Sequence, residues 1–190
     1  MASDTTLVTG KVRLSYAHLF EPHVNPSAPA GSKPKYSATL LISKDDTETL
    51  DKIKKAQQNA LEKFKDSKFE GKIPKAWKST LRDADSPEEE DMLEKNPEYA
   101  GHYFMSVSNT MRPGLVDRNR TPILDPDEIY SGCYARVQIN AFAFNTQGNK
   151  GISFGLNNVQ KLADGEPFGA VIEKAENVFG DVDGDDDGLI

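Results

Sequence analysis

Aromatic and polar side chains alternate with small apolar ones along residues 133–145, CYARVQINAFAFN. Successive side chains of an extended strand point to opposite faces. One face would carry Ala135, Val137, Ile139, Ala141 and Ala143. The other would carry Tyr134, Arg136, Gln138, Asn140, Phe142 and Phe144. Exposed rings are unfavourable unless a partner covers them, and unpaired nucleobases stack on such rings with about 1–3 kcal/mol per base. The pattern predicts base stacking, and packing of the two phenylalanines under a helix or loop is an equal alternative.

Basic residues lie beside aromatic ones elsewhere in the chain. Tyr36 adjoins Lys33 and Lys35, and Trp77 lies between Lys75 and Lys78. Tyr36 and Trp77 therefore join Tyr134, Phe142 and Phe144 as predicted stacking residues. Clustered cations along a groove bind phosphates without regard to base sequence. The predicted phosphate contacts are Lys11, Arg13, Lys33, Lys35, Lys75, Lys78, Arg112, Arg118, Arg120, Arg136 and Lys150. A partly buried core position for Trp77 and ordinary surface charge for the arginines are the alternatives.

Residues that could support catalysis or hold a metal form no recognisable arrangement. His18, His23, His102 and the single Cys133 match no zinc spacing. No phosphate-binding glycine loop, nucleophile elbow or zinc-protease helix motif is present. Residues 183–188 resemble the start of a calcium loop, but the bidentate acid at position twelve would fall beyond Ile190. We therefore expect no enzyme activity, no metal and no cofactor.

The net charge of −7 is concentrated in two segments. Residues 173–190 carry −6 and residues 83–98 carry −7, so the rest of the chain carries +6. Such asymmetry favours an acidic tail and a cationic surface. A solvated acidic loop together with a solubilising tail is an equal alternative. No apolar run is long enough to span a membrane, and the N-terminus lacks the pattern of a signal peptide.

The elements that must position these side chains are mostly strands. The predicted strands are 7–20, 35–43, 102–110, 133–145 and 152–162, the last two joined by a hairpin turn at 146–151. Asp45 and Asp46 precede a predicted helix of about twenty residues with apolar residues at helical spacing. We expect a mainly β fold with one or two helices, an OB-fold-like five-stranded antiparallel barrel. This domain would span residues 1–172 with an acidic insertion at about 83–98, and residues 173–190 would form a disordered acidic tail.

These segments resemble a family of phage single-stranded DNA-binding proteins that was long catalogued as a domain of unknown function. The similar stretches are RLSYAHLFEP (13–22), KPKYSATLLISKDD (33–46), MRPGLVD (111–117), IYSGCYARVQINAFAFN (129–145) and GNKGISFGLNNVQKLADGEP (148–167). FGLNNVQ (154–160) and YSGCYAR (130–136) carry the resemblance most specifically. It implies an OB-fold, no catalysis, and protection of single-stranded DNA during phage replication or recombination in the cytoplasm of a bacterial host.

The resemblance also implies a role for the acidic tail. In the broader class, the tail recruits replication proteins and competes with DNA for the cationic groove. The residues concerned here are Asp181, Asp183, Asp185, Asp186, Asp187, Leu189 and Ile190. Tails of that class usually end in an aromatic residue, whereas this one ends in Leu189 and Ile190. An RNA-binding OB domain, or a phage structural or assembly protein that uses the aromatic face as a protein interface, are the alternative functions.

Overall fold

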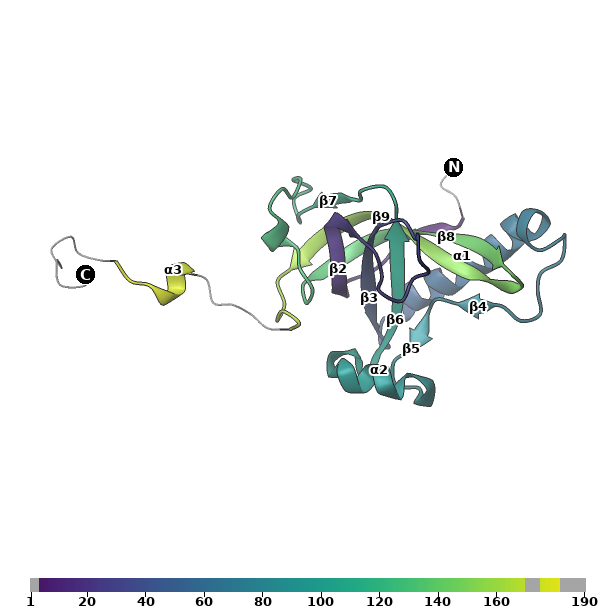
Figure 1. The fold of residues 1–190 in the computed structure, drawn as a ribbon, viewed down its shortest axis with the longest axis horizontal. Helices are drawn as coiled ribbons and strands as arrows, with labels where there is room; N and C mark the ends of the chain where they lie inside the picture. The colour runs from purple at the N-terminus through teal and green to yellow at the C-terminus, as the bar shows by residue number, and fades with distance from the viewer. Residues whose placement is uncertain (1–3, 170–174, 182–190) are drawn as a thin grey trace.

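The structure is a computed structural model that describes residues 4–169 and 175–181 (Figure 1). Five long strands dominate the described chain. They are β2 (Val12–His23), β3 (Lys35–Ser43), β6 (His102–Asn109), β8 (Tyr134–Thr146) and β9 (Asn149–Ala163). Each overlaps one of the five strands predicted from the sequence, so the prediction of a mainly β fold is confirmed.

The five long strands form an OB-like ring in the order β2–β3–β6–β9–β8, and β8 pairs again with β2. Four of the five strand pairs are antiparallel, whereas β6 and β9 run parallel and pair Ser108 with Gly155. The expectation of an antiparallel barrel is therefore wrong for the β6–β9 pair. The reason is topological, because the strands of a closed ring cannot all be antiparallel to both neighbours when their number is odd. The barrel closes only partially between β6 and β9.

Four short strands extend this ring. The described residues form one nine-stranded sheet. The strand β1 (Thr6–Val8) pairs with β8, β5 (Arg82–Asp83) pairs with β6, and both β4 (Lys78–Ser79) and β7 (Gly114–Val116) run parallel to β9.

The predicted helix is α1 (Thr47–Lys68). Its N-cap is Asp46, whose carboxylate accepts a hydrogen bond from the backbone N–H of Thr49 at 3.2 Å. The buried face of α1 carries residues at helical spacing, namely Leu50, Ile53, Ala56, Gln57, Ala60 and Leu61. These positions agree with the apolar stripe in the sequence, and α1 packs against the core.

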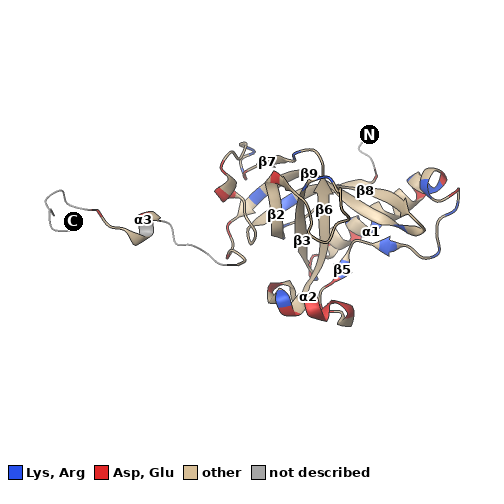
Figure 2. Cartoon of the chain, in the orientation of Figure 1, with Lys and Arg blue, Asp and Glu red and all other residues tan. Residues whose placement is uncertain are grey.

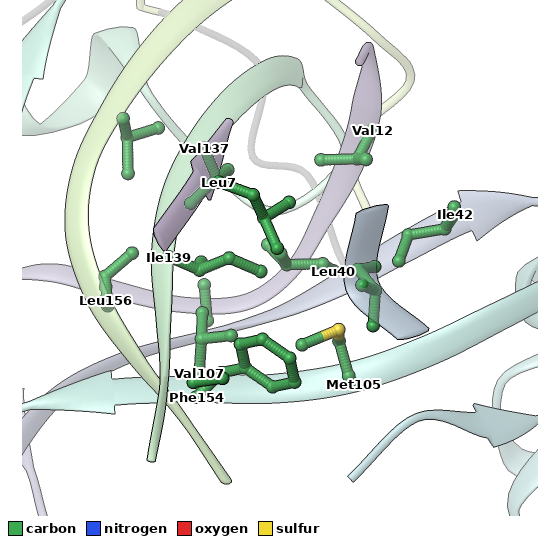
Figure 3. Close-up of a cluster of buried hydrophobic side chains, with 14 of the residues drawn as sticks. Leu7, Val12, Leu40, Ile42, Met105, Val107, Val137, Ile139, Phe154 and Leu156 are labelled. Carbon is green, nitrogen blue, oxygen red and sulfur yellow. The ribbon is translucent and has the colours of Figure 1, made fainter. Parts of the chain in front are cut away.

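The core fills the ring with side chains from every long strand. Figure 3 shows Val12, Leu40, Ile42, Met105, Val107, Val137, Ile139, Phe154 and Leu156 pointing into one cluster. The inward face of β8 is buried as its alternation predicts, since Ala135, Val137, Ile139, Ala141 and Ala143 are all at most 4% exposed.

Strand β2 departs from simple alternation at Tyr16. This residue has φ 45°, a left-handed conformation that is rare for a bulky side chain, and the pairing of β2 with β3 shifts register between Ser15 and His18. As a result Ser15 is buried, while Tyr16 is 58% exposed. The alternation that buries Val12 and Leu14 therefore does not extend to Tyr16.

The acidic insertion is a folded unit, which we call the acidic unit (residues 84–99). It comprises the 3-10 turns η1 (Pro87–Glu89) and η2 (Pro97–Tyr99) around the short helix α2 (Glu90–Lys95). Ala84 and Tyr99 are buried against Leu41 and Phe104, and Met92 and Leu93 pack on this second core. The acidic unit therefore covers part of the outer face of β3 and β6. Figure 2 shows acidic residues gathered around α2.

Residues beyond β9 are described in part. A single helical turn, α3 (Ala175–Val178), forms within the segment predicted as a disordered tail, and Asp181 is exposed. The other predicted tail residues, Asp183, Asp185, Asp186, Asp187, Leu189 and Ile190, lie outside the described residues. Among the helices of the described chain, none has the length and apolar character needed to cross a membrane.

Candidate nucleic-acid interface

A groove of ≈ 860 Å³ lies on β2, β3 and β6, next to the loop of residues 24–34. We call it the β2–β3–β6 groove. Its lining includes Tyr16, His18, His23, Lys33, Lys35 and a set of small hydroxyl side chains. These strands are the first three of the barrel, and the loop joins the first to the second. This is the region by which OB-folds bind oligonucleotides.

Small hydroxyl side chains line this groove where β3 and β6 pair. Ser37 lies opposite Ser108, and Thr39 lies opposite Ser106 with 3.5 Å between their hydroxyl oxygens. They alternate along β3 with the buried Ala38 and Leu40, which face the core. Small residues leave room for a ligand, and hydroxyls can donate and accept hydrogen bonds. Further along the same face, the acidic unit covers the strands and ends the open surface.

Two stacked imidazoles line the groove. The rings of His18 and His23 lie 4.1 Å apart with 8° between their planes. Burial lowers the pKa of His18, and the neighbouring His23 lowers it further. Lys33 and Lys35 also line the groove, and both are exposed. Among the described residues that line the groove, none is a carboxylate, so its charged groups favour an anion.

Tyr16 connects the groove to the acidic unit. Its ring lines the groove, and its hydroxyl donates to the Oδ1 atom of Asn96 at 2.9 Å. A left-handed backbone conformation at a tyrosine costs free energy, and residues in such conformations cluster at binding sites. The acidic unit thus helps to hold a groove residue in position.

The outer face of β8 has its polar groups paired within the protein. Arg136 donates to the Oε1 atom of Gln160 at 2.7 and 3.2 Å, and Asn158 donates to Gln138 at 2.8 Å. Asn140 accepts from the hydroxyls of Thr5 and Thr6, both at 2.9 Å. These side-chain hydrogen bonds account for the polar residues on the outer face of β8 without a ligand.

The two phenylalanines of that face differ. Phe142 is 38% exposed, whereas the half-buried ring of Phe144 lies over Gly151, its partner on β9. A Cβ atom at Gly151 would lie 2.6 Å from Phe144 Cζ, so the glycine is what admits the ring. Phe142 keeps a surface for stacking, and Phe144 is partly used in packing.

Tyr134, at the start of β8, lies next to Arg13 on β2, and neither residue lines the groove. The Nζ atom of Lys11 and the guanidinium of Arg13 lie 5.2 and 5.4 Å from the Tyr134 ring centroid. Arg13 also donates to the carbonyl of Gly132 at 2.9 Å and to that of Glu166 at 2.6 Å, and its guanidinium lies 4.2 Å from the Phe168 ring centroid. Arg13 therefore anchors the segment after β9, with two of its five N–H donors engaged in these bonds.

The remaining predicted residues are scattered over the surface. Trp77 is half-buried against the core, and Lys78 on β4 reaches Asn149 at 3.4 Å beside the β8–β9 hairpin. Arg118 donates to the carbonyl of Leu162 at 3.1 Å, and Arg112 lies 5.4 Å from the Phe20 ring centroid. The groove itself brings together two of the predicted phosphate contacts, Lys33 and Lys35. Three more predicted contacts are exposed or half-buried elsewhere, namely Lys75, Arg120 and Lys150.

Sequence reasoning missed several residues of the groove. His18 and His23 were considered as metal ligands alone, and among the described residues no group of three or more His, Cys, Asp or Glu could hold a metal ion. The hydroxyl residues of β3 and β6 were not predicted. A signal for them does exist, because small polar residues at every second position beside lysines mark a strand face with room for a ligand. Tyr36 at the start of β3 is half-buried and pairs with Asn109.

Comparisons with known proteins point to one family. Residues 5–189 match the family described as "Enterobacter phage Enc34, ssDNA-binding protein". A protein called p50 from Acyrthosiphon pisum secondary endosymbiont phage 1 is 34% identical over 167 residues, which are 83% of this chain and 83% of p50.

Solved structures give the same result. The single-stranded DNA-binding protein of bacteriophage Enc34, in complex with ssDNA, matches with a TM-score of 0.70 and 29% identity, covering 87% of this chain and 90% of that one. The same Enc34 protein in a separate structure matches with a TM-score of 0.67 and 26% identity, covering 92% and 90%. The single-stranded DNA-binding protein gp2.5 of bacteriophage T7 matches with a TM-score of 0.58 and 14% identity, covering 89% and 97%, which shows a shared fold.

Proposed function

This chain belongs to the family of the Enterobacter phage Enc34 ssDNA-binding protein, and from that premise we propose that it binds single-stranded DNA in the β2–β3–β6 groove. The observation that carries this proposal is the groove itself, ≈ 860 Å³ in volume and lined by two lysines and two imidazoles on the face that OB-folds use for oligonucleotides. The protein acts as a binder and carries out no reaction on the DNA.

The chemistry of the groove supports binding without sequence preference. Lys33 and Lys35 supply point charges for phosphates, and Tyr16 supplies an exposed ring on which a base of any kind can stack. Four hydroxyl groups can donate hydrogen bonds to sugar and phosphate oxygens, namely those of Ser37, Thr39, Ser106 and Ser108. None of these groups reads a donor and acceptor pattern that is specific to one base.

Binding of oligo-dT across a salt series tests the proposal. The logarithm of the association constant should fall linearly with the logarithm of salt concentration, with a slope of about −0.7 for each phosphate contact. The double variant Lys33→Ala/Lys35→Ala should bind about tenfold more weakly at low salt, and its slope should be shallower by roughly 1.4 because two contacts are lost.

The matched control is Lys54→Ala/Lys55→Ala, which removes two exposed lysines from α1 outside the groove. This control should keep both the affinity and the slope. An affinity that ignores salt would contradict the electrostatic part of the proposal. Competition between matched DNA and RNA oligonucleotides separates it from an RNA-binding function. A chain that ignores oligo-dT but self-associates would favour the assembly-protein alternative.

We further propose a biological setting and a role for the tail. The protein covers exposed single strands during phage replication or recombination in the cytoplasm of the bacterial host. Residues 1–172 form the DNA-binding domain. The acidic residues at 173–190 compete with DNA for the cationic surface and recruit replication or recombination proteins. The support for this role is the charge of −6 on that segment beside the +6 on the chain outside both acidic segments.

A further inference from the structure

We propose that the stacked imidazoles of His18 and His23 form a phosphate subsite that takes up a proton when single-stranded DNA enters the groove. The proposal rests on the proposed function and adds a specific contact to it. Nothing in the sequence pattern suggested it, because the two histidines lie five positions apart on β2 and meet through the irregular course of that strand.

The geometry places both rings where a phosphate would come. His18 and His23 are stacked at 4.1 Å, nearly parallel, and both line the groove together with Lys33 and Lys35. Parallel stacking covers the faces of the two rings, whereas the nitrogens lie on the ring edges. An imidazolium donates from both of its nitrogens, so a protonated pair can offer several donors to phosphodiester oxygens.

The free groove disfavours that protonated state. The pKa of His18 is lowered by its burial and by the nearby His23. The other titratable or charged side chains in the groove are Tyr16 on β2 and the two lysines of the facing segment, while β6 contributes Ser106, Val107 and Ser108. Within the described lining, no carboxylate is present to stabilise an imidazolium.

A phosphate reverses this balance, because its negative charge stabilises an imidazolium. The pKa of His18, which is lowered in the free protein, is then higher in the complex. By linkage, DNA binding takes up protons at a pH between the two values, so the affinity rises as pH falls through this range. The gain in DNA affinity disappears at a pH above the imidazole pKa in the complex, where both rings stay neutral.

The test is the dissociation constant of oligo-dT at constant ionic strength from about pH 8 to about pH 6, a range in which histidine titrates. We expect the affinity to rise about tenfold over this range, with a slope no steeper than that for one proton. The double variant His18→Gln/His23→Gln should still bind at the higher pH but show a flat profile. The matched control is His102→Gln, which removes the third histidine of the chain, a residue outside the groove, and should keep the slope.

Two further measurements test whether the histidines contact phosphate rather than bases. An abasic oligomer with the same phosphates should retain the pH slope, and loss of the slope with this probe would overturn the phosphate subsite in favour of base stacking on the rings. Proton NMR titration of the histidine ring signals should show the pKa of His18 rising on addition of oligo-dT.

Unchanged histidine pKa values, or a slope that persists in the double variant, overturn the subsite. So does an affinity that is the same at every pH, and each of these results leaves the proposed function standing. Absence of oligo-dT binding at all pH values overturns both.

Discussion

At the scale of single residues, the Tyr99 side chain joins the acidic unit to the barrel. Its hydroxyl donates to the Oγ atom of Ser15 at 2.8 Å, and both residues are 2% exposed. Burial raises the pKa of Tyr99 to about 12, so the hydroxyl stays protonated and able to donate throughout the physiological range. The next residue of β2 is Tyr16, which lines the groove. The bond therefore helps to fix the strand at the point where it becomes irregular.

Tyr99→Phe should destabilise the protein by about 1–3 kcal/mol, because it leaves a buried hydroxyl without its donor. Denaturant unfolding followed by circular dichroism measures the change. The control is Tyr16→Phe, which removes an exposed hydroxyl bonded to Asn96 and should cost roughly 0.5 kcal/mol or less. Equal stability losses for the two variants would show that the Tyr99–Ser15 hydrogen bond contributes no more to the free energy of unfolding than the exposed Tyr16–Asn96 bond.

At the scale of elements, the segment that follows β9 is anchored to β2 and to the loop that precedes β8. Arg13 donates to the Glu166 carbonyl, and the single O–H of Tyr130 can donate to Asp164 Oδ1 at 3.0 Å or to the Gly165 carbonyl at 3.1 Å. Lys161 forms an ion pair with Asp164 at 2.7 Å. These contacts fix the path of residues 164–168, and so they set where the chain leaves the barrel toward the acidic tail.

Gly132 is a point of close backbone approach in this anchor. It has φ +113°, and a Cβ atom there would lie 2.3 Å from the Glu166 carbonyl oxygen. Gly132→Ala should cost about 3 kcal/mol or more, since it combines an unfavourable backbone conformation with a clash against backbone. Thermal unfolding gives the loss of stability. Faster amide hydrogen exchange over residues 164–168 would show that the anchor has detached.

Gly148 provides the control for the conformational part of that loss. It has φ +85° in the β8–β9 turn, and a Cβ atom there would meet nothing within 4 Å. Gly148→Ala should cost about 1–2 kcal/mol from the backbone alone. If both substitutions cost the same, the close approach between Gly132 and Glu166 does not constrain the segment.

The elements were predictable to different degrees. The two faces of β8 and the apolar stripe of α1 follow regular periods of two and 3.6 residues, so the core positions could be read from the sequence. The irregularity of β2 could not, because a left-handed tyrosine has no marker in residue type. The pairing of His18 with His23 was missed for a similar reason, since the register of β2 against β3 shifts again between these two residues. Lys33 and Lys35 were predicted as phosphate contacts, and the structure places both in the groove beside hydroxyl residues that were not predicted.

At the scale of the whole molecule, charge is divided between separate regions. The acidic unit packs on the outer face of β3 and β6 next to the groove, while the groove lining carries cations and imidazoles. A strongly negative surface beside a positive groove confines an anionic strand to the groove. The net charge of −7 therefore says little about the binding face.

Removal of the tail tests the proposed competition at this scale. A chain that ends at Ile172 loses a charge of −6 and should bind oligo-dT more tightly than the full chain, most visibly at low salt, where charges are least screened. Binding is measured for both chains across the same salt series. Equal affinities would show that the tail does not compete with DNA.

The most direct test of the central claim is to map the DNA on the protein by backbone amide chemical shifts during titration of the full chain with oligo-dT. The account predicts that the largest changes occur at Tyr16, His18, His23, Lys33 and Lys35, and along β6 at Ser106 and Ser108. Changes confined to the outer face of β8 and β9, around Arg136 and Phe142, with the β2–β3–β6 groove unaffected, would contradict it.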